Sequence, residues 1–349
     1  NLECRACYRQ KSAGMRPVTD ILADVSVIER HQRVHTLSLA GGEPTLHPEL
    51  VSIVRAVKAR GHRVSLVTNG LLLTSTLLSA LRSAGLDIVM IHVDEGQCRP
   101  DLSDALDSAQ VNRLRETIAA RVHAHRIAVG FCVTLYPDSL SNLPSLVDLF
   151  LRLPHVNFLF ATHSVLIPEV VARARKKMTA GQPACCGTTN RMVMEEMRRH
   201  FNLEPYAFIP PSSPDAKGEL PCVTYSIPVS HRPSPVFLRM DSGFADRCLI
   251  RLCRLLAGRY PYFTPDYLAA TLVQIVFNGF CAGHPLRVVR FLSGAMGAPL
   301  RIKRLVFENA PRITPEGTVN CCDFCPNSTV RNGRVVPVCL ADHERDLNL

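Results

Sequence analysis

The stretch V-H-T-L-S-L-A-G-G-E-P-T, residues 34–45, decides the fold of this chain. Its apolar first part predicts a β-strand, and the two glycines before Glu43 predict a tight turn at the carboxyl end of that strand. Pro48 begins a helical pattern that stops at Gly61, and a second strand, R-V-S-L-V-T, follows at residues 63–68. A strand, a helix and a strand of these lengths predict a parallel βαβ unit.

The same alternation continues through the first half of the chain. We expect helices at residues 17–32, 75–84, 111–124 and 140–153, and strands at residues 87–93, 126–135 and 155–160. Consecutive units of this kind make an α/β fold, and the expected architecture is a partial (β/α) barrel. In such folds the chemistry lies at the carboxyl ends of the strands.

Distinctive residues fall at that edge of the predicted sheet. The G-G-E turn at residues 41–43 follows one strand, and the T-N-G turn at residues 68–70 follows the next. Cys4 and Cys7 form a C-x2-C pair ahead of both turns. Alone, this pair is typical of zinc ribbons, redox dithiols and iron–sulfur sites alike. The combination on successive βα units is far more specific than any of its parts.

The order C-x2-C-Y, G-G-E-P-T and T-N-G resembles the radical S-adenosylmethionine (radical SAM) superfamily, whose cluster motif is C-x3-C-x2-C. Cys4 and Cys7 match the second and third cysteines of that motif. The first cysteine would fall immediately before Asn1. We therefore expect the sequence to be an amino-terminally truncated record of a longer protein, which would supply this cysteine and the first strand of the barrel.

The resemblance implies the cofactors and their ligands. A [4Fe–4S] cluster held by three thiolates leaves one iron open to the amino and carboxylate groups of S-adenosylmethionine. Reductive cleavage would give a 5′-deoxyadenosyl radical that abstracts hydrogen from an unactivated carbon, with a flavodoxin- or ferredoxin-type electron donor. The residues expected to bind S-adenosylmethionine are Gly41, Gly42, Glu43, Thr68, Asn69, Asp94 and Tyr8, with Glu43 and Asp94 as the catalytic-site carboxylates.

Several of these assignments have alternatives. Asp94 is expected near the ribose or methionine of S-adenosylmethionine, or else caps the next segment as a loop carboxylate. Tyr8 follows Cys7, whereas the superfamily often has an aromatic residue just before the last cysteine. Thr134 and His163 end later strands at the same edge, and either line the substrate pocket or have structural roles.

A second group of cysteines lies near the carboxyl terminus: Cys321, Cys322, Cys325 and Cys339. Their spacing is typical of metal or cluster ligands, and the segment resembles the auxiliary iron–sulfur (SPASM/twitch-like) extension of many radical SAM enzymes. We favour an auxiliary [4Fe–4S] cluster on Cys322, Cys325 and Cys339. The fourth ligand stays open between Cys321, Cys185, Cys186, Cys222 and a substrate atom, and structural zinc or unligated thiols are the alternatives.

The composition narrows the class of protein. The chain has 349 residues, 14 cysteines, no tryptophan and a formal net charge of +10. Few aromatic residues argue against a nucleic-acid partner. The amino end lacks an apolar signal-peptide core, and clustered cysteines suit a reducing compartment, so we expect a cytoplasmic protein. The longest apolar stretch, residues 267–283, is too short to span a membrane and predicts a buried helix, with a membrane-surface role as the alternative.

We expect three parts: a radical SAM core at residues 1–164, a loop-rich and helical substrate region at residues 165–300, and a Cys-rich module at residues 301–349. The helical region has basic edges at Arg287, Arg290, Arg301, Lys303 and Arg304. They favour a lipid-like or anionic substrate, with a peptide as the alternative. A non-catalytic iron–sulfur or zinc-binding protein is the alternative of a different class.

Overall fold

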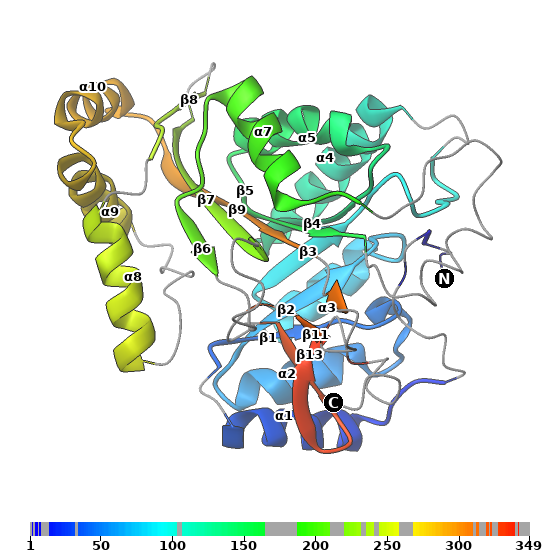
Figure 1. Ribbon diagram of the computed structural model, residues 1–349. Coiled ribbons are helices and arrows are strands. Elements are labelled where there is room, and N and C mark those ends of the chain that lie inside the picture. The colour runs from blue at the N-terminus through cyan, green and yellow to red at the C-terminus, as the bar shows by residue number, and fades with distance from the viewer. Residues whose placement is uncertain are drawn as a thin grey trace.

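The computed structural model describes residues 2, 4–5, 7, 14–31, 34–102, 107–164, 187–209, 220–231, 235–240, 244–257, 268–309, 312–313, 319–320, 322, 327–338 and 341 (Figure 1). Six of the described strands run parallel: β1 (Thr36–Leu39), β2 (Arg63–Thr68), β3 (Ile88–His92), β4 (Ala128–Leu135), β5 (Val156–His163) and β9 (Leu300–Glu308). β7 (Cys222–Ser230) runs antiparallel to β9 and pairs with β6 (Ala207–Ile209) and β8 (Val236–Phe237).

The order of the main sheet is β1-β2-β3-β4-β5-β9-β7-β6, with β8 paired to β7. The predicted α/β class and the successive parallel strands are therefore confirmed. β9 comes from the part of the chain expected to hold the Cys-rich module, yet it pairs with β5 from Phe158↔Arg304 to Thr162↔Glu308. The three-part division of the chain stays a prediction.

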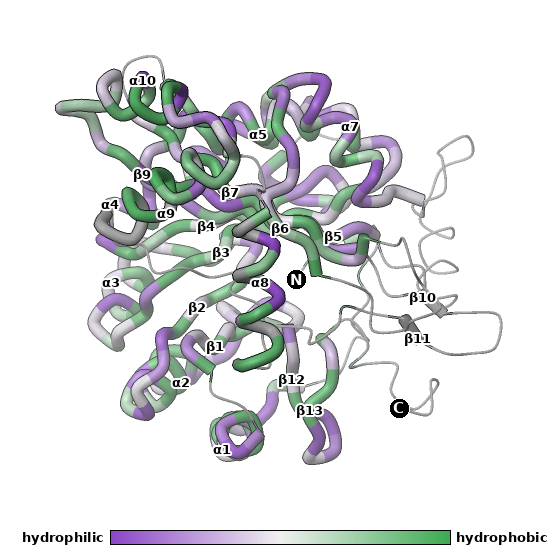
Figure 2. Tube along the Cα trace, turned by 60° about the vertical axis from the view of Figure 1, so that its left-hand side comes forward, coloured by the Kyte–Doolittle hydropathy of each residue, from purple (hydrophilic) through white to green (hydrophobic). Residues whose placement is uncertain are grey.

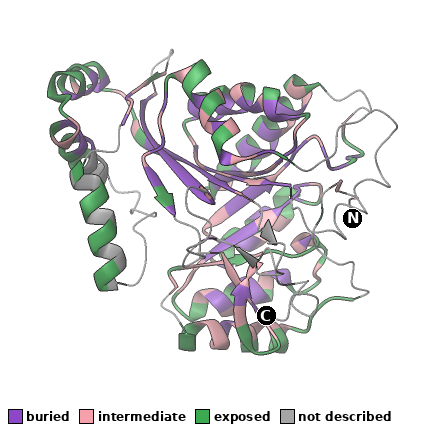
Figure 3. Ribbon diagram, viewed as in Figure 1, coloured by how far each residue is buried: buried purple, intermediate pink, exposed green. Residues whose placement is uncertain are grey.

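Helices cover one face of this sheet (Figure 1). They are α1 (Val18–His31), α2 (Leu50–Ala59), α3 (Ser75–Ser83), α4 (Ser108–Ala124), α5 (Leu143–Arg152) and α7 (Asn190–Phe201). Alternate strand residues such as Leu66, Phe131 and Leu305 point into the core and are fully buried. Figure 3 shows buried residues in purple along the strands and on parts of the helices.

The opposite side of the sheet, which we call the open face, carries the other strand residues. His92, Cys132, Phe160 and Val306 stand in one register row across β3, β4, β5 and β9. Thr134, Thr162 and Glu308 stand in the next row, nearer the carboxyl edge. Many of these side chains are half-buried, so polar groups of several strands can meet a bound molecule here.

Three further helices stand beside the sheet: α8 (Phe244–Ala257), α9 (Leu268–Cys281) and α10 (Pro285–Ala295). A small core of their own includes Ile275, Val288 and Phe291. Gly279 lets α9 and α10 meet, because an added Cβ would lie 2.3 Å from Val288 Cγ2. Among the described helices, none combines the length and apolar character that crossing a membrane requires. The predicted helix at residues 267–283 exists, but the prediction that it is buried is wrong for one side, where Phe280 is exposed.

Short antiparallel pairs end the described chain. They are β10 (Arg312–Ile313) with β11 (Val319–Asn320), and β12 (Ser328–Arg331) with β13 (Arg334–Pro337). The β12–β13 hairpin packs on α1, near the first strand of the sheet. The carboxyl-terminal segment thus lies against the amino-terminal part of the fold.

Lys303 corrects one expectation from the sequence. The sequence predicts it at a basic edge that favours an anionic substrate, but its side chain is fully buried and its Nζ donates to the carbonyls of Phe150, Leu153 and Val156 at 2.7, 2.5 and 2.6 Å. The ammonium group therefore satisfies carbonyls at the end of α5 and the start of β5. A substrate cannot reach it.

Lys303→Met should flatten the pH dependence of folding stability. Burial lowers the pKa of Lys303 to about 7, against about 10.4 in an unfolded chain. Between these values the unfolded state binds more protons, so this residue makes stability rise with pH, by up to about 1.4 kcal/mol per pH unit. Urea unfolding of the wild type and of Lys303→Met at about pH 7.5 and about pH 9 measures how the free energy of unfolding changes with pH in each protein. Arg301→Met, an exposed change on the same strand, should keep the wild-type slope; equal slopes in all three proteins would contradict the assignment.

Candidate active site

The carboxylate of Glu43 joins the turn after β1 to the turn after β2. Its Oε1 accepts from the backbone N–H of Thr45 at 3.0 Å, from the Thr45 hydroxyl at 2.5 Å and from the Thr68 hydroxyl at 2.7 Å. Its Oε2 accepts from the backbone N–H of Asn69 at 2.8 Å. Because Glu43 is buried, these four donors replace water and lock the G-G-E and T-N-G turns together.

The glycines of these turns shape the space around that carboxylate. Gly41 has φ +154°, which other residues rarely adopt, and an added Cβ at Gly41 or Gly42 would meet nothing within 4 Å. Both glycines are exposed, so their backbone is open to a ligand. Gly70 has φ +81°, and an added Cβ would lie 3.0 Å from Ile118 of α4. The first turn is therefore open, whereas the second closes on the helix layer.

The Cys4–Cys7 loop is docked on the same edge through Arg5. The backbone N–H of Arg5 donates to the carbonyl of Gly96, after β3, at 2.7 Å. Its guanidinium makes a bidentate pair with Asp138, after β4, at 2.7 and 2.6 Å. The hydrogen bond from Arg5 lowers the pKa of Asp138. Two strand ends thus hold the loop that carries the cysteines.

Tyr136 completes this anchor. The Arg5 guanidinium lies 4.1 Å from the centre of the Tyr136 ring, and the ring is buried. An added Cβ at Gly96 would lie 2.4 Å from the Tyr136 hydroxyl oxygen. Glycine is therefore needed at residue 96 to let the tyrosine reach beneath the arginine.

Asp94 is buried just after β3, and both its oxygens have protein partners. Oδ1 accepts from Gly96 N at 2.9 Å, and Oδ2 lies 3.0 Å from His92 Nε2 and accepts from Thr134 N at 3.2 Å. Burial alone would raise the pKa of Asp94, but His92 and the two N–H groups outweigh it and lower the pKa. His92, with its side chain 29% exposed, is the member of this pair that reaches the open face.

Two buried arginines brace the same edge. Arg99 donates to the carbonyl of Asn69 at 2.8 Å and makes a bidentate pair with Asp101 at 2.8 and 2.9 Å. Arg115 donates through Nε to the carbonyl of Val93 at 2.9 Å. These contacts tie the turns after β2 and β3 to each other and to α4. Arg99 is thus paired inside the protein.

The open face holds two more titratable groups. Burial, with the charges of Asp94 and Glu308, raises the pKa of Cys132 to about 12, so this thiol stays neutral. Burial raises the pKa of Glu308 to about 7, while Asn327 Nδ2 donates to its two oxygens at 2.9 and 3.0 Å. Glu308 is a candidate that the sequence did not reveal, because nothing in the pattern placed β9 beside β5.

His163 has a structural role in this arrangement. It is buried, with Nδ1 at 2.8 Å from the Thr188 hydroxyl and Nε2 at 2.9 Å from Asn190 Oδ1. Burial lowers the pKa of His163 to about 4, so the ring is neutral. Of the two alternatives for this residue, the structural one therefore holds.

The predicted auxiliary site is for the most part not described. Cys321, Cys325 and Cys339 lie outside the described residues, as do Tyr8, Cys185 and Cys186. Cys322 is buried and packs in an apolar cluster with Cys222 and Val306. Within the described residues, no group of three or more His, Cys, Asp or Glu side chains is arranged to hold a metal ion. The auxiliary cluster stays a prediction.

The parallel sheet carries the glycine turns and the docked cysteine loop at the carboxyl ends of its strands, as in an α/β domain with its chemistry at that edge. Residues 1–150 match the family model of the radical SAM superfamily. This part of the chain is therefore a radical SAM domain, as the motifs at its carboxyl edge predicted.

Several curated proteins are similar to the chain. The cofactor-modifying protein of tungsten-containing aldehyde ferredoxin oxidoreductase from Pyrococcus furiosus is 28% identical over 180 residues, 49% of this chain and 51% of that protein. PqqA peptide cyclase from Ruegeria pomeroyi is 30% identical over 118 residues, 34% of this chain and 31% of that protein. A probable GTP 3′,8-cyclase from Saccharolobus islandicus is 40% identical over 97 residues, 27% of this chain and 31% of that protein. The chain spans about half or less of the length of these relatives.

Solved structures are also similar to part of the fold. Streptococcus suis SuiB bound to S-adenosylmethionine has a TM-score of 0.41 and 13% identity, over 57% of this chain and 44% of that one. Native anSMEcpe with bound AdoMet has a TM-score of 0.41 and 16% identity, over 58% of this chain and 56% of that one.

The family implies a [4Fe–4S] cluster and S-adenosylmethionine, and the residues present fit both. Cys7 is exposed and Cys4 half-buried on a loop that is anchored at the site edge. The backbone at Gly41 and Gly42 is open to a ligand, and its contact with S-adenosylmethionine stays a prediction. Cys4 and Cys7 would hold irons of the cluster.

Arg5→Met should weaken cluster binding without unfolding the domain. It removes the ion pair with Asp138 and the ring contact with Tyr136, which fix the loop between the two cysteines. Groups that orient metal ligands are typically worth about 10- to 100-fold in affinity. Iron and sulfide per chain after anaerobic reconstitution, and the rate of iron loss to a chelator, measure the effect. Arg16→Met, which removes an ion pair with Asp24 on α1, is the matched control, and wild-type iron retention in Arg5→Met would contradict the role.

Glu43→Gln should destabilise the two turns. The substitution replaces one carboxylate oxygen with an amide NH2 group, which donates hydrogen bonds. This group would then face another donor, from Thr45, Thr68 or Asn69. A buried group left without its partner typically costs about 1–3 kcal/mol. Urea unfolding measures this, and equilibrium dialysis should show weaker S-adenosylmethionine binding. Glu49→Gln is the control, because Glu49 is exposed and its side chain makes no cap hydrogen bond; equal stability of the two variants would refute the cross-link.

Proposed function

We propose that the chain forms the core of a radical SAM enzyme, which takes one electron from a flavodoxin- or ferredoxin-type donor to cleave S-adenosylmethionine into methionine and a 5′-deoxyadenosyl radical. That radical abstracts a hydrogen atom from the substrate and leaves as 5′-deoxyadenosine. The observation that carries this proposal is the anchoring of the Cys4–Cys7 loop by Arg5 on the turns after β3 and β4. This anchoring supports a cluster site beside the G-G-E and T-N-G turns. The match of residues 1–150 supports the same reaction class.

The residues of the chain have distinct tasks in this reaction. When bound, the cluster and S-adenosylmethionine supply a carbon-centred radical at the edge of the open face. Cys4 and Cys7 hold the cluster, and Arg5 keeps their loop in place. Glu43 fixes the two turns that border the methionine end of S-adenosylmethionine. Asp94 orients the ring of His92 toward the open face, where it can donate or accept a hydrogen bond.

We infer that a peptide is a better substrate for this site than a lipid. Thr134, Thr162 and Glu308 stand in one row at the carboxyl edge, and such groups suit the hydrogen bonds of a peptide backbone. The name of PqqA peptide cyclase, one of the similar proteins, points the same way. The apolar helices that favoured a lipid-like substrate stand at the start of β9, roughly 26 Å from Glu308 at about 3.3 Å per residue.

Anaerobic reconstitution with iron and sulfide, followed by dithionite and S-adenosylmethionine, tests the reaction class. The whole protein should release 5′-deoxyadenosine, and a Cys4→Ala/Cys7→Ala double variant should lose this activity together with its iron. Release of 5′-deoxyadenosine should increase, or a modified peptide should form, when the peptide substrate is present. Iron-loaded protein that makes no 5′-deoxyadenosine would refute the proposal, and zinc in place of iron and sulfide would favour a non-catalytic zinc protein.

A further inference from the structure

The helices α8, α9 and α10 expose large apolar side chains that the site does not use. Leu255 and Leu256 on α8 are 78% and 76% exposed, Phe280 on α9 is 71% exposed, and Leu286 on α10 is 82% exposed. Figure 2 shows hydrophobic stretches along α8 and α9. Large apolar side chains exposed on neighbouring helices are typical of an interaction site in soluble proteins.

The composition of α9 gives the strongest indication that a binding partner covers this surface. Its sequence, L-A-A-T-L-V-Q-I-V-F-N-G-F-C, contains no charged residue. A helix that is apolar around its circumference is normally buried on all sides. Here Ile275 packs inward, but Val273 and Phe280 face solvent at 68% and 71% exposure.

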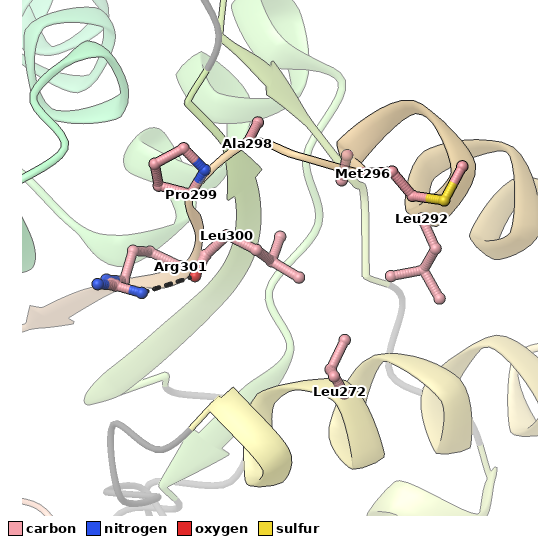
Figure 4. Close-up of a pocket in the computed structure, with 8 residues that line it drawn as sticks. Leu272, Leu292, Met296, Ala298, Pro299, Leu300 and Arg301 are labelled. Atoms are coloured by element: carbon pink, nitrogen blue, oxygen red, sulfur yellow. Dashed lines mark hydrogen bonds between the residues drawn. The ribbon is translucent and has the colours of Figure 1, made fainter.

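Grooves run along this surface. One, of about 510 Å³, is lined by apolar side chains that include Leu272, Leu292 and Met296, and Arg301 stands at its polar end (Figure 4). A second, of about 480 Å³, runs along α9 between Val273 and Phe280. Both are apolar and shallow enough to receive flexible hydrocarbon.

The charges around the apolar surface have one dominant sign. Residues 268–307 contain no Asp or Glu, while Arg287, Arg290 and Arg301 are exposed there. On α8, Arg247 and Arg251 are exposed as well, and Asp246 is the single acidic residue of that helix. An apolar helix face with basic flanks is the pattern of helices that lie in the interface of an anionic membrane.

We propose that α8, α9 and α10 form a docking surface for an anionic lipid bilayer. The apolar side chains of the three helices would enter the boundary between head groups and acyl chains, and the arginines would meet lipid phosphates. A second copy of the chain fits less well, because a symmetric dimer would bring the same arginines together. The proposal does not rest on the proposed radical SAM reaction.

The position of the surface is compatible with activity. α10 leads into the first residues of β9, whereas the site lies at the carboxyl ends of the parallel strands (Figure 1). A bilayer at the helices would therefore leave the Cys4–Cys7 loop and the open face accessible.

Vesicle flotation of the whole protein tests the proposal. We expect binding to phosphatidylcholine vesicles that contain phosphatidylglycerol at least about tenfold above binding to phosphatidylcholine alone, since each basic residue near the surface adds to the attraction. High salt should weaken it. Leu255→Glu/Leu256→Glu and Phe280→Glu should each lower binding at least about tenfold. Their thermal unfolding should match the wild type, because the changed side chains are exposed.

Matched controls separate the outcomes. Met15→Glu adds a charge at an apolar residue that is 52% exposed far from these helices along the chain, and it should bind vesicles as the wild type does. Arg287→Gln/Arg290→Gln should lose the preference for anionic vesicles. Absence of flotation, equal binding of both vesicle types, or a dimer that Leu255→Glu/Leu256→Glu dissociates without any vesicle binding would each overturn the proposal. Release of 5′-deoxyadenosine without vesicles is measured separately, so a failure here leaves the proposed reaction untouched.

Discussion

The hydrogen bonds on the Glu43 carboxylate are the constraint on which the site depends. Parallel strands end side by side, but the turns that follow them have no ladder hydrogen bonds to fix them to one another. Glu43 supplies this connection between β1 and β2 with four donors from residues up to 26 positions apart. Asp94 and Arg99 extend the connection to β3 and β4. Without these cross-links, the open backbone at Gly41 would not keep a defined position.

The structure shows what the two carboxylates singled out by the sequence, Glu43 and Asp94, contact within the protein. The oxygens of Glu43 and Asp94 accept hydrogen bonds from the protein itself, and the predicted contact of these carboxylates with S-adenosylmethionine stays a prediction. Groups that lie open at this edge include the backbone of Gly41 and Gly42, Cys7 and the ring of His92. The two buried carboxylates thus hold the turns at this edge of the sheet in place.

The sequence predicted local features well and distant pairings poorly. The strands β1 to β5 and the helices between them follow from apolar runs, from Gly61 and Gly85 as helix ends, and from short connections. The pairing of β9 with β5 joins residues about 146 positions apart, and no local pattern carries that information. His92 was overlooked because it reads as one residue of an alternating strand, although its position two residues before Asp94 puts both on the same side. Lys303 was misread because a lysine in a basic stretch is usually exposed.

β9 connects the two ends of the molecule physically. It begins at Leu300 beside the apolar groove, passes the buried Lys303, and ends at Glu308 on the open face next to Asn327. A strand in the centre of a sheet is stiff, because ladder hydrogen bonds on both sides hold it. β9 therefore holds Leu300 and Glu308 at a fixed separation, while residues 296–299 connect it to α10. Through the hydrogen bonds that Asn327 donates to Glu308, the end of β9 also holds the carboxyl-terminal segment against the sheet.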